Sequence, residues 1–197
     1  MPESARSSED KLLERARQGD ERAFRQLVER YEGLVAATVI GMLGPGPDAE
    51  DVGQETFIRF YRALKSFRGD SSVGTYLTRI AINQSLKALE KKKRWTARFT
   101  SRDQTEVPYD PVSTDPVASD ALASRESAAA VQRAIRELSP NHRAVVVLRM
   151  IDGYSTRDTA EILEIPQGTV LSRLSRAMDS LKVLLTPHVE DYERQGS

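Results

Sequence analysis

Hydrophobic and polar residues recur along this chain with the spacing of amphipathic helices. Residues 20–31 are predicted to form a helix because their apolar positions fall at i, i+3, i+4 and i+7, at Phe24, Leu27, Val28 and Tyr31. A second apolar segment, residues 34–43, ends at the sequence GPGP, which interrupts any helix. The pattern therefore favours short packed helices from the start of the chain.

The next predicted helix, residues 48–65, has two different faces. Pro47 and the nearby carboxylates suit a helix start, with Asp48 as the expected cap. One face is apolar and includes Val52 and Phe60. An isoleucine is surrounded by polar groups on the other face, which carries Asp51, Gln54, Glu55, Ile58 and Arg62. Either this face binds a partner or Ile58 is simply a singly exposed apolar residue, which is common on protein surfaces.

A further helix is predicted over residues 76–93, and its polar stripe suggests nucleic-acid binding. The stripe combines an aromatic ring, an amide and two cations at Tyr76, Arg79, Asn83 and Lys87. Residues 79–94 hold six Lys or Arg against one Glu and end in KKKR. An amide can read a base edge, an aromatic ring can stack on an unstacked base, and cations neutralise phosphate. The alternative is an ordinary solvated helix face.

Residues 96–126 are predicted to be a linker, since they hold three prolines, many Ser, Thr and Asp residues, and no apolar period. The linker separates a block at residues 11–95 from a block at 127–186. The second block begins with a predicted helix over 127–138 whose inward residues are Val131, Ile135 and Leu138. Ser139 and Pro140 then suit the N-cap and first position of another helix. The β-branched run HRAVVVLRMI is expected to be helical, because no partner strand is apparent.

Two short helices joined by a tight turn follow in the second block. Ser155 and Asp158 form a capping pattern, and Pro166 ends the turn that begins at Glu164. A helix over residues 167–185 should bury Val170, Leu174, Ala177, Met178, Leu181 and Leu184 and expose Ser172, Ser175 and Arg176, with Arg173 at the rim. This is the pattern of a helix-turn-helix, which presents its second helix to a DNA major groove. Glu164 stands where glycine is usual, and a positive φ there would cost about 1–2 kcal/mol.

Composition narrows the functional classes. The 197-residue chain has no net charge and no cysteine, which excludes a disulfide-stapled scaffold and a thiolate zinc site. Only His142 and His188 are present, and no phosphate-binding loop or hydrolase motif occurs, so neither an enzyme nor a cofactor is expected. No segment has the roughly 20 apolar residues of a membrane span. An all-α, two-domain, cytoplasmic protein without membrane insertion is predicted.

Two long motifs resemble the extracytoplasmic-function (ECF) sigma factors, the promoter-recognition subunits of bacterial RNA polymerase. The first is DAEDVGQETFIRFYRALKSFRGDSSVGTYLTRIAINQSLKALEKKKR, and the second is LSPNHRAVVVLRMIDGYSTRDTAEILEIPQGTVLSRLSRAMDSLKVLL. They occur in the family's order across a linker. The resemblance implies a region 2 helical bundle at 11–95, a linker at 96–126 and a region 4 helix-turn-helix at 127–186. It also implies core RNA polymerase, promoter DNA and an anti-sigma factor as partners.

The resemblance also implies roles for individual residues. Contacts to the coiled coil of the polymerase beta-prime clamp would come from Asp51, Gln54, Glu55, Ile58 and Arg62, and the second domain would contact the beta flap. The -10 element would be bound by Tyr76, Arg79, Asn83, Lys87, Lys91 and Arg94. The -35 element would be bound by Gln167, Thr169, Ser172, Arg173, Ser175 and Arg176.

Four positions depart from the family pattern. Leu171 replaces a residue that is often basic, Tyr76 replaces a frequent tryptophan, Glu164 replaces the turn glycine, and Gly74 lies at a helix start. The alternative function is a helix-turn-helix regulator that binds DNA without polymerase. It would give no use to the helices at 48–94, and core polymerase would not be recovered with it.

Overall fold

The computed structural model describes residues 3–99 and 119–195. Every regular element in these two ranges is a helix, which confirms the predicted all-α class. None of the helices in the described ranges combines the length and the hydropathy needed to cross a bilayer.

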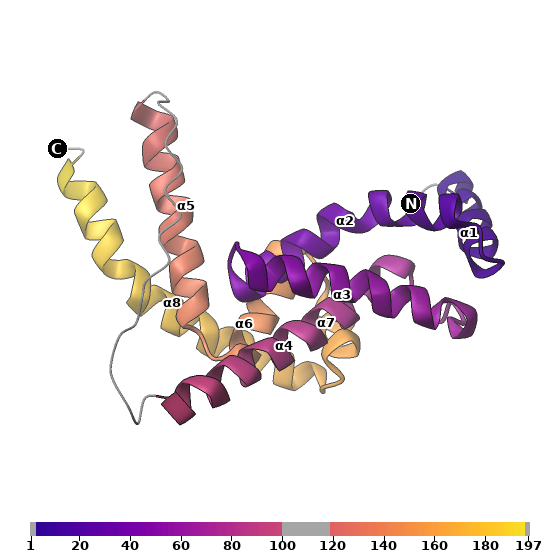
Figure 1. Cartoon of the computed structure of the whole chain (residues 1–197). Helices are drawn as coiled ribbons and strands as arrows, with labels where there is room; N and C mark the ends of the chain where they lie inside the picture. The colour runs from indigo at the N-terminus through magenta and orange to yellow at the C-terminus, as the bar shows by residue number, and fades with distance from the viewer. Residues whose placement is uncertain (1–2, 100–118, 196–197) are drawn as a thin grey trace.

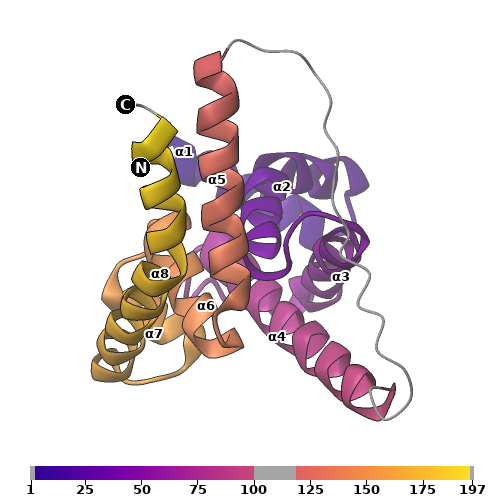
Figure 2. The ribbon, with the colours of Figure 1, turned by 90° about the vertical axis from the view of Figure 1, so that its left-hand side faces the viewer.

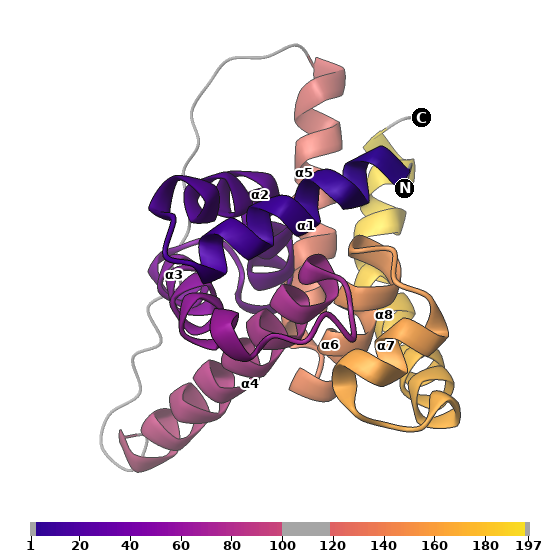
Figure 3. The same cartoon turned by 90° about the vertical axis from the view of Figure 1, so that its right-hand side faces the viewer.

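The first domain contains four α-helices and a short 3-10 turn (Figure 1). The helices are α1 (Glu3–Arg17), α2 (Glu21–Leu43), α3 (Pro47–Ala63) and α4 (Val73–Phe99), and η1 (Leu64–Ser66) follows α3. Helices α2, α3 and α4 pack against one another, while α1 lies across α2 (Figure 3). Their apolar faces form one core, whose most buried members include Ala23, Leu27, Val35, Phe60, Leu77 and Ala81.

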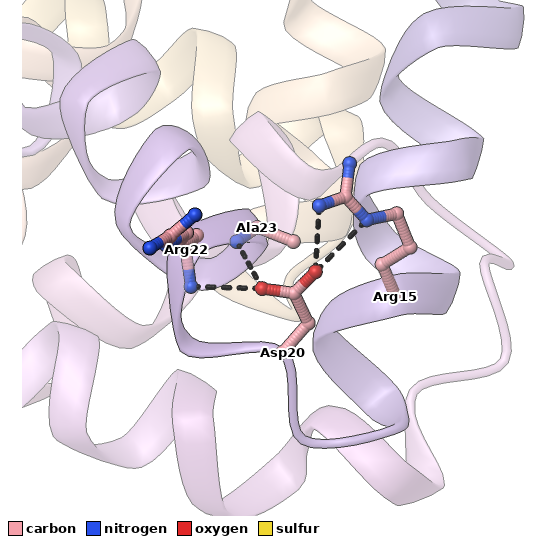
Figure 4. Close-up of polar contacts among 4 residues, drawn as sticks. All are labelled: Arg15, Asp20, Arg22 and Ala23. Atoms are coloured by element: carbon pink, nitrogen blue, oxygen red, sulfur yellow. Dashed lines mark hydrogen bonds and ion pairs between the residues drawn. The ribbon is translucent and has the colours of Figure 1, made fainter.

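Asp20 fixes the junction between α1 and α2 (Figure 4). One carboxylate oxygen accepts hydrogen bonds from the backbone N–H groups of Arg22 and Ala23, at 2.9 and 3.1 Å. The other oxygen accepts from the Arg15 guanidinium, at 2.6 and 2.9 Å. The Ala23 amide, followed by Arg15, lowers the pKa of the Asp20 carboxyl. A single aspartate thus caps α2 and ties α1 to it.

Several sequence predictions for this domain need correction. The apolar segments at 20–31 and 34–43 form one continuous helix, because a lone glycine at 33 weakens a helix without ending it. Asp48 does not cap α3, since Gly46 takes the N-cap position and Pro47 the first turn. Helix α1 was not predicted. Helix α4 begins at Val73, and Gly74 lies inside it, where a Cβ atom would come within 3.2 Å of the Tyr31 ring.

The second domain contains α5 (Ser119–Glu137), α6 (Pro140–Val146), η2 (Val147–Ile151), α7 (Thr156–Leu163) and α8 (Gln167–Gln195). The run HRAVVVLRMI is helical as predicted, and its second half, η2, is a π-helical turn. Helices α5 and α8 pack side by side through a core that includes Ile135, Leu138, Ala177 and Leu181 (Figure 2). Val131, Met178 and Leu184 are exposed, contrary to prediction, because α5 and α8 each cover only part of the other's surface.

Helices occupy both ends of the segment 96–126 that was predicted to be a linker. Residues 96–99 continue α4 and residues 119–126 belong to α5, while residues 100–118 lie outside the described part of the chain.

The two domains are in direct contact. Helices α2 and α4 of the first domain pack against α6, η2 and α7 of the second. The contact forms a shared apolar cluster, built from Met42 and Ile82 on one side and Ala144, Val147, Leu148 and Ile162 on the other. All six side chains are at most 2% exposed. The sequence analysis did not predict this packing.

Candidate nucleic-acid interface

The tight turn between α7 and α8 has the geometry of a helix-turn-helix. The Ser155 hydroxyl accepts a hydrogen bond from the Asp158 N–H at 3.1 Å, so Ser155 caps α7 as predicted. Glu164 ends α7 with φ 55° and ψ 43°, the left-handed conformation that its position in the turn requires. Val170 and Ala160 are buried where the two helices meet, with Ile165 packed against them. The second helix is therefore held rigidly at its first turns.

The start of α8 presents a polar surface. Gln167, Ser172, Ser175 and Arg176 are exposed, whereas Thr169 and Arg173 are partly buried. Neither Arg173 nor Arg176 forms an ion pair within the described residues, so both guanidinium groups are available to a ligand. The Ser172 hydroxyl donates to the Thr169 carbonyl at 3.1 Å and keeps its lone pairs for accepting. Leu171 is 56% exposed beside these residues and offers only apolar contact.

The C-terminal part of α4 projects from the body of the molecule (Figure 2). Asn83, Lys87 and Lys91 are exposed and make no ion pair within the described residues. Arg94 pairs with Glu90 at 3.3 Å, and Lys92 with Asp48 at 3.7 Å. These exposed pairs contribute little to stability, and a phosphate could replace the carboxylates.

Tyr76 and Arg79, at the start of the stripe, are less accessible than predicted. The Tyr76 ring is partly buried, with its centroid 5.0 Å from that of Phe67 and 6.2 Å from that of Phe60. The Arg79 guanidinium is turned toward the second domain, where Nη2 donates to the Glu161 carbonyl at 3.0 Å. The structure thus brings Asn83, Lys87, Lys91 and Arg94 to one surface and places Arg79 between the domains.

The polar face of α3 forms a separate surface. Asp51, Gln54, Ile58 and Arg62 are exposed, and Glu55 is partly exposed and paired with Arg59 at 2.7 Å. Ile58 is 45% exposed, and Tyr61 on the same helix is 50% exposed. Tyr61 was missed by the sequence analysis, although its i+3 spacing from Ile58 was a usable signal. Its ring lies edge-on to Phe24, at a centroid distance of 4.8 Å.

A second exposed aromatic residue is Trp95, which ends the cationic cluster KKKRW and is 63% exposed on α4. It follows Lys91 by one helical turn, so an aromatic ring lies beside the cationic stripe. No group of three or more His, Cys, Asp or Glu side chains suited to a metal occurs among the residues that the structure describes. The arrangement provides surfaces for binding polyanions and partner proteins.

Comparison with known proteins identifies both domains. Residues 27–95 match the family model for sigma-70 region 2, and residues 128–181 match that for sigma-70 region 4. The chain is 34% identical to RNA polymerase sigma-H factor of Pseudomonas aeruginosa, over 91% of this chain and 94% of that protein. It is 36% identical to the ECF RNA polymerase sigma-E factor of Escherichia coli K12, over 89% of this chain and 93% of that protein.

Two solved structures have a similar fold. CnrH, in complex with the cytosolic domain of CnrY, aligns with a TM-score of 0.61 and 29% identity over 88% of this chain and 94% of its own. The sigma factor RpoE of Bartonella quintana, in complex with the anti-sigma factor NepR, aligns with a TM-score of 0.63 and 24% identity over 82% of this chain and 96% of its own. With two family models in order and relatives aligned over nearly the whole chain, the protein belongs to the ECF sigma factors of the sigma-70 family, non-catalytic proteins that direct promoter recognition by RNA polymerase.

Proposed function

We propose that the polar face of α3 is the surface that binds the beta-prime clamp coiled coil of core polymerase. Asp51, Gln54, Glu55, Ile58 and Arg62 form this surface, and Tyr61 extends it. The main support is the exposure of Ile58 and Tyr61 within a ring of charged groups, because apolar and aromatic anchors with a polar rim are typical of protein interfaces.

Helix α4 is proposed to hold the non-template strand of the -10 element. The exposed Asn83 amide can read a base edge, while Lys87, Lys91 and Arg94 neutralise phosphates. Extruding a base costs a few kcal/mol, so a surface that holds the open strand must supply that energy. Tyr76 and Arg79 complete this surface once they are accessible.

The second domain is proposed to read the -35 duplex and to contact the beta flap. The first turns of α8 carry Gln167, Thr169, Ser172, Arg173, Ser175 and Arg176, and its backbone N–H groups add an anion site. Arginine can bond both acceptors of guanine in the major groove, and serine tolerates several bases.

Promoter binding is proposed to depend on polymerase. The chain carries 29 basic and 29 acidic residues, so its overall field does not attract DNA. Polymerase raises the effective concentration of each reading surface at its own DNA element, because it binds the chain and the promoter together.

An anti-sigma factor is proposed as a further partner, and the cytoplasm as the site of action. The support is that the aligned structures of CnrH and RpoE are complexes with CnrY and with the anti-sigma factor NepR. Neither a metal nor a cofactor is assigned a role.

The single observation that supports these three roles is that α3, α4 and α8 each carry exposed polar side chains of their own. The test is transcription in vitro with core polymerase on a randomised promoter library, combined with a pull-down of core enzyme. Start sites that share a -35 and a -10 sequence are expected. Failure to recover core enzyme would favour the polymerase-independent regulator.

A further inference from the structure

Trp95 has an unusually exposed ring for a residue of its type. It is the only tryptophan of the chain and is 63% exposed. Among the large apolar side chains of the described residues, only Val183 is more exposed, at 73%. Tryptophan is on average a highly buried residue, because a ring left in water forfeits the large free-energy gain of burial. The indole is therefore accessible to a ligand that would cover it.

The ring lies on the same side of α4 as the cationic side chains. Successive residues of an α-helix are turned by about 100°, so residues of this stripe fall within an arc of about 120°. The side chains in this arc are Asn83, Lys87, Lys91, Arg94, Trp95 and Arg98, and all of them are exposed. Over residues 83–98, six Lys or Arg stand against one Glu. Trp95 is thus an aromatic group within a basic stripe.

The residues around Trp95 distinguish between classes of ligand. Residues 90–98 read EKKKRWTAR, so Trp95 and Ala97 are the only apolar side chains in this part of α4. A protein interface has an apolar core, and a helix that docks on a membrane has a continuous apolar face. A single aromatic ring among cations instead suits a polyanion that carries flat rings of its own. The composition therefore favours nucleic acid.

An unpaired base fits the indole better than a base pair does. Bases in a duplex are stacked on one another, so only their edges are open in the grooves. An unpaired base exposes its face, and the face of any base can stack on an aromatic ring. Lys91 and Arg98 lie four residues before and three residues after Trp95, so both are its neighbours on the helix surface. They are placed to neutralise the phosphates on either side of a stacked base.

We propose that Trp95 is a further base-binding position of α4, where its indole stacks on one unpaired base of the displaced promoter strand. This position rests on the proposed function, which assigns Asn83 to the same strand. Trp95 follows Asn83 by twelve residues, or roughly 18 Å along the helix. A stacked strand advances about 3.4 Å per nucleotide, so the base at Trp95 lies within about five nucleotides of the base at Asn83. Because stacking accepts any base, Trp95 adds affinity for the open strand without sequence preference.

The test uses holoenzyme and a promoter, selected from the randomised library, whose -10 region is held open by mismatches. Single abasic nucleotides are placed in turn at each displaced-strand position within five nucleotides of the base read by Asn83. The lifetime of the promoter complex is measured for wild type, Trp95→Leu and Trp95→Phe. Leucine keeps an apolar side chain without a ring, and phenylalanine keeps a smaller ring. Both variants should keep the wild-type Tm within a few degrees, because the side chain is exposed.

One abasic position is expected to shorten the lifetime of the wild-type complex at least about fivefold. Trp95→Leu should shorten the lifetime on the intact strand by a similar factor, and the abasic nucleotide should then cause no further loss. Trp95→Phe should retain part of the sensitivity to that position. If Trp95→Leu causes an equal loss at every abasic position, Trp95 contacts phosphate or duplex DNA and the proposal is overturned. A lifetime that Trp95→Leu leaves unchanged would overturn it as well.

A fluorescent base gives a direct measurement of stacking at the same position. The base is replaced by 2-aminopurine, whose fluorescence is quenched when it stacks on an aromatic ring. In the promoter complex its emission should be lower with wild type than with Trp95→Leu. Equal emission with the two proteins would contradict stacking.

Control variants separate this proposal from the proposed function. Asn83→Ala should be coupled to a different nucleotide, and if it is coupled to none, the assignment of Asn83 fails while the result for Trp95 stands. Lys91→Ala should shorten the lifetime by the same factor at every position and reduce its salt dependence, because phosphate carries no sequence information. A pull-down of core polymerase without DNA completes the test. Loss of core binding in Trp95→Leu would assign the ring to a protein contact and overturn the proposal.

Discussion

The Thr38 hydroxyl lies 2.9 Å from a carboxylate oxygen of Asp152, although 114 positions separate the two residues. The same hydroxyl lies 3.0 Å from the Leu34 carbonyl. Thr38 has one proton to donate, so an ionised Asp152 competes with Leu34 for it. A protonated Asp152 can instead donate to Thr38, which leaves the threonine proton for Leu34. Burial, the main cause, raises the pKa of the Asp152 carboxyl from 3.8 to about 6.

This shift predicts that the folded chain gains stability in mild acid. A raised pKa means that the folded state favours the protonated form. The stabilising contribution is therefore fully present below pH 3.8 and is lost as pH rises through about 6. Asp152→Asn should remove this component, so the difference in Tm between wild type and variant should change between pH 4 and pH 7. The exposed Asp179→Asn is the control, and an equal change in that variant would contradict the assignment to Asp152.

Replacement of Glu164 by glycine should stabilise the folded chain. It is the only residue other than glycine with positive φ in the described part of the chain. Glu164→Gly should relieve the crowding of Cβ and raise the free energy of unfolding by up to about 1 kcal/mol. Glu164→Ala should show no such gain, because alanine keeps the Cβ atom. Urea denaturation measures both, and equal stability of the two variants would contradict strain at this turn.

Removal of the Arg176 side chain should weaken promoter binding in a way that depends on the -35 sequence. Its exposed guanidinium has no ion-pair partner in the described residues, so its removal should leave the fold unchanged. If it bonds guanine, Arg176→Ala should cost about 1–3 kcal/mol at matched promoters and little at mismatched ones. Open-complex formation on both promoter types measures this difference. Lys182→Ala, farther along α8, is the control. Equal loss on all sequences would make Arg176 a phosphate contact.

A charge at position 58 should weaken polymerase binding without destabilising the fold. The side chain is 45% exposed, so Ile58→Glu should leave Tm within a few degrees of the wild-type value. A charge buried without a partner in an interface is costly, so affinity for core polymerase should fall at least about tenfold. Val131→Glu, at a residue that is 41% exposed in the second domain, is the control. Unchanged affinity of Ile58→Glu would remove α3 as the clamp surface.

Local chemistry accounts for the predictions that were confirmed. Ser155 with Asp158, Ser139 with Pro140, and the turn at Glu164 each depend on residues within four positions of one another. The β-branched run after His142 was correctly expected to be helical because no partner strand was available. Such signals depend only on residues that are close together in the sequence, so tertiary packing does not alter them.

The errors arose where tertiary packing decides. Gly33 did not interrupt α2, and Val131, Met178 and Leu184 are exposed because the packing of α5 on α8 selects fewer positions than periodicity suggests. The contacts between Thr38 and Asp152, or between Arg79 and Glu161, leave no trace in local pattern. The glycine at position 41, inside an apolar helix, was the one local hint that another backbone comes close there.

Amide hydrogen exchange near Gly41 in α2 should depend on the contact between the two domains. A glycine lowers the local cost of fraying, and η2 covers the helix at that position. When the second domain departs, the amide protons of that turn lose their shelter and should exchange with solvent sooner than those nearer the Asp20 cap. Hydrogen-exchange protection at the turn around Gly41 should therefore report whether the second domain is in contact with α2.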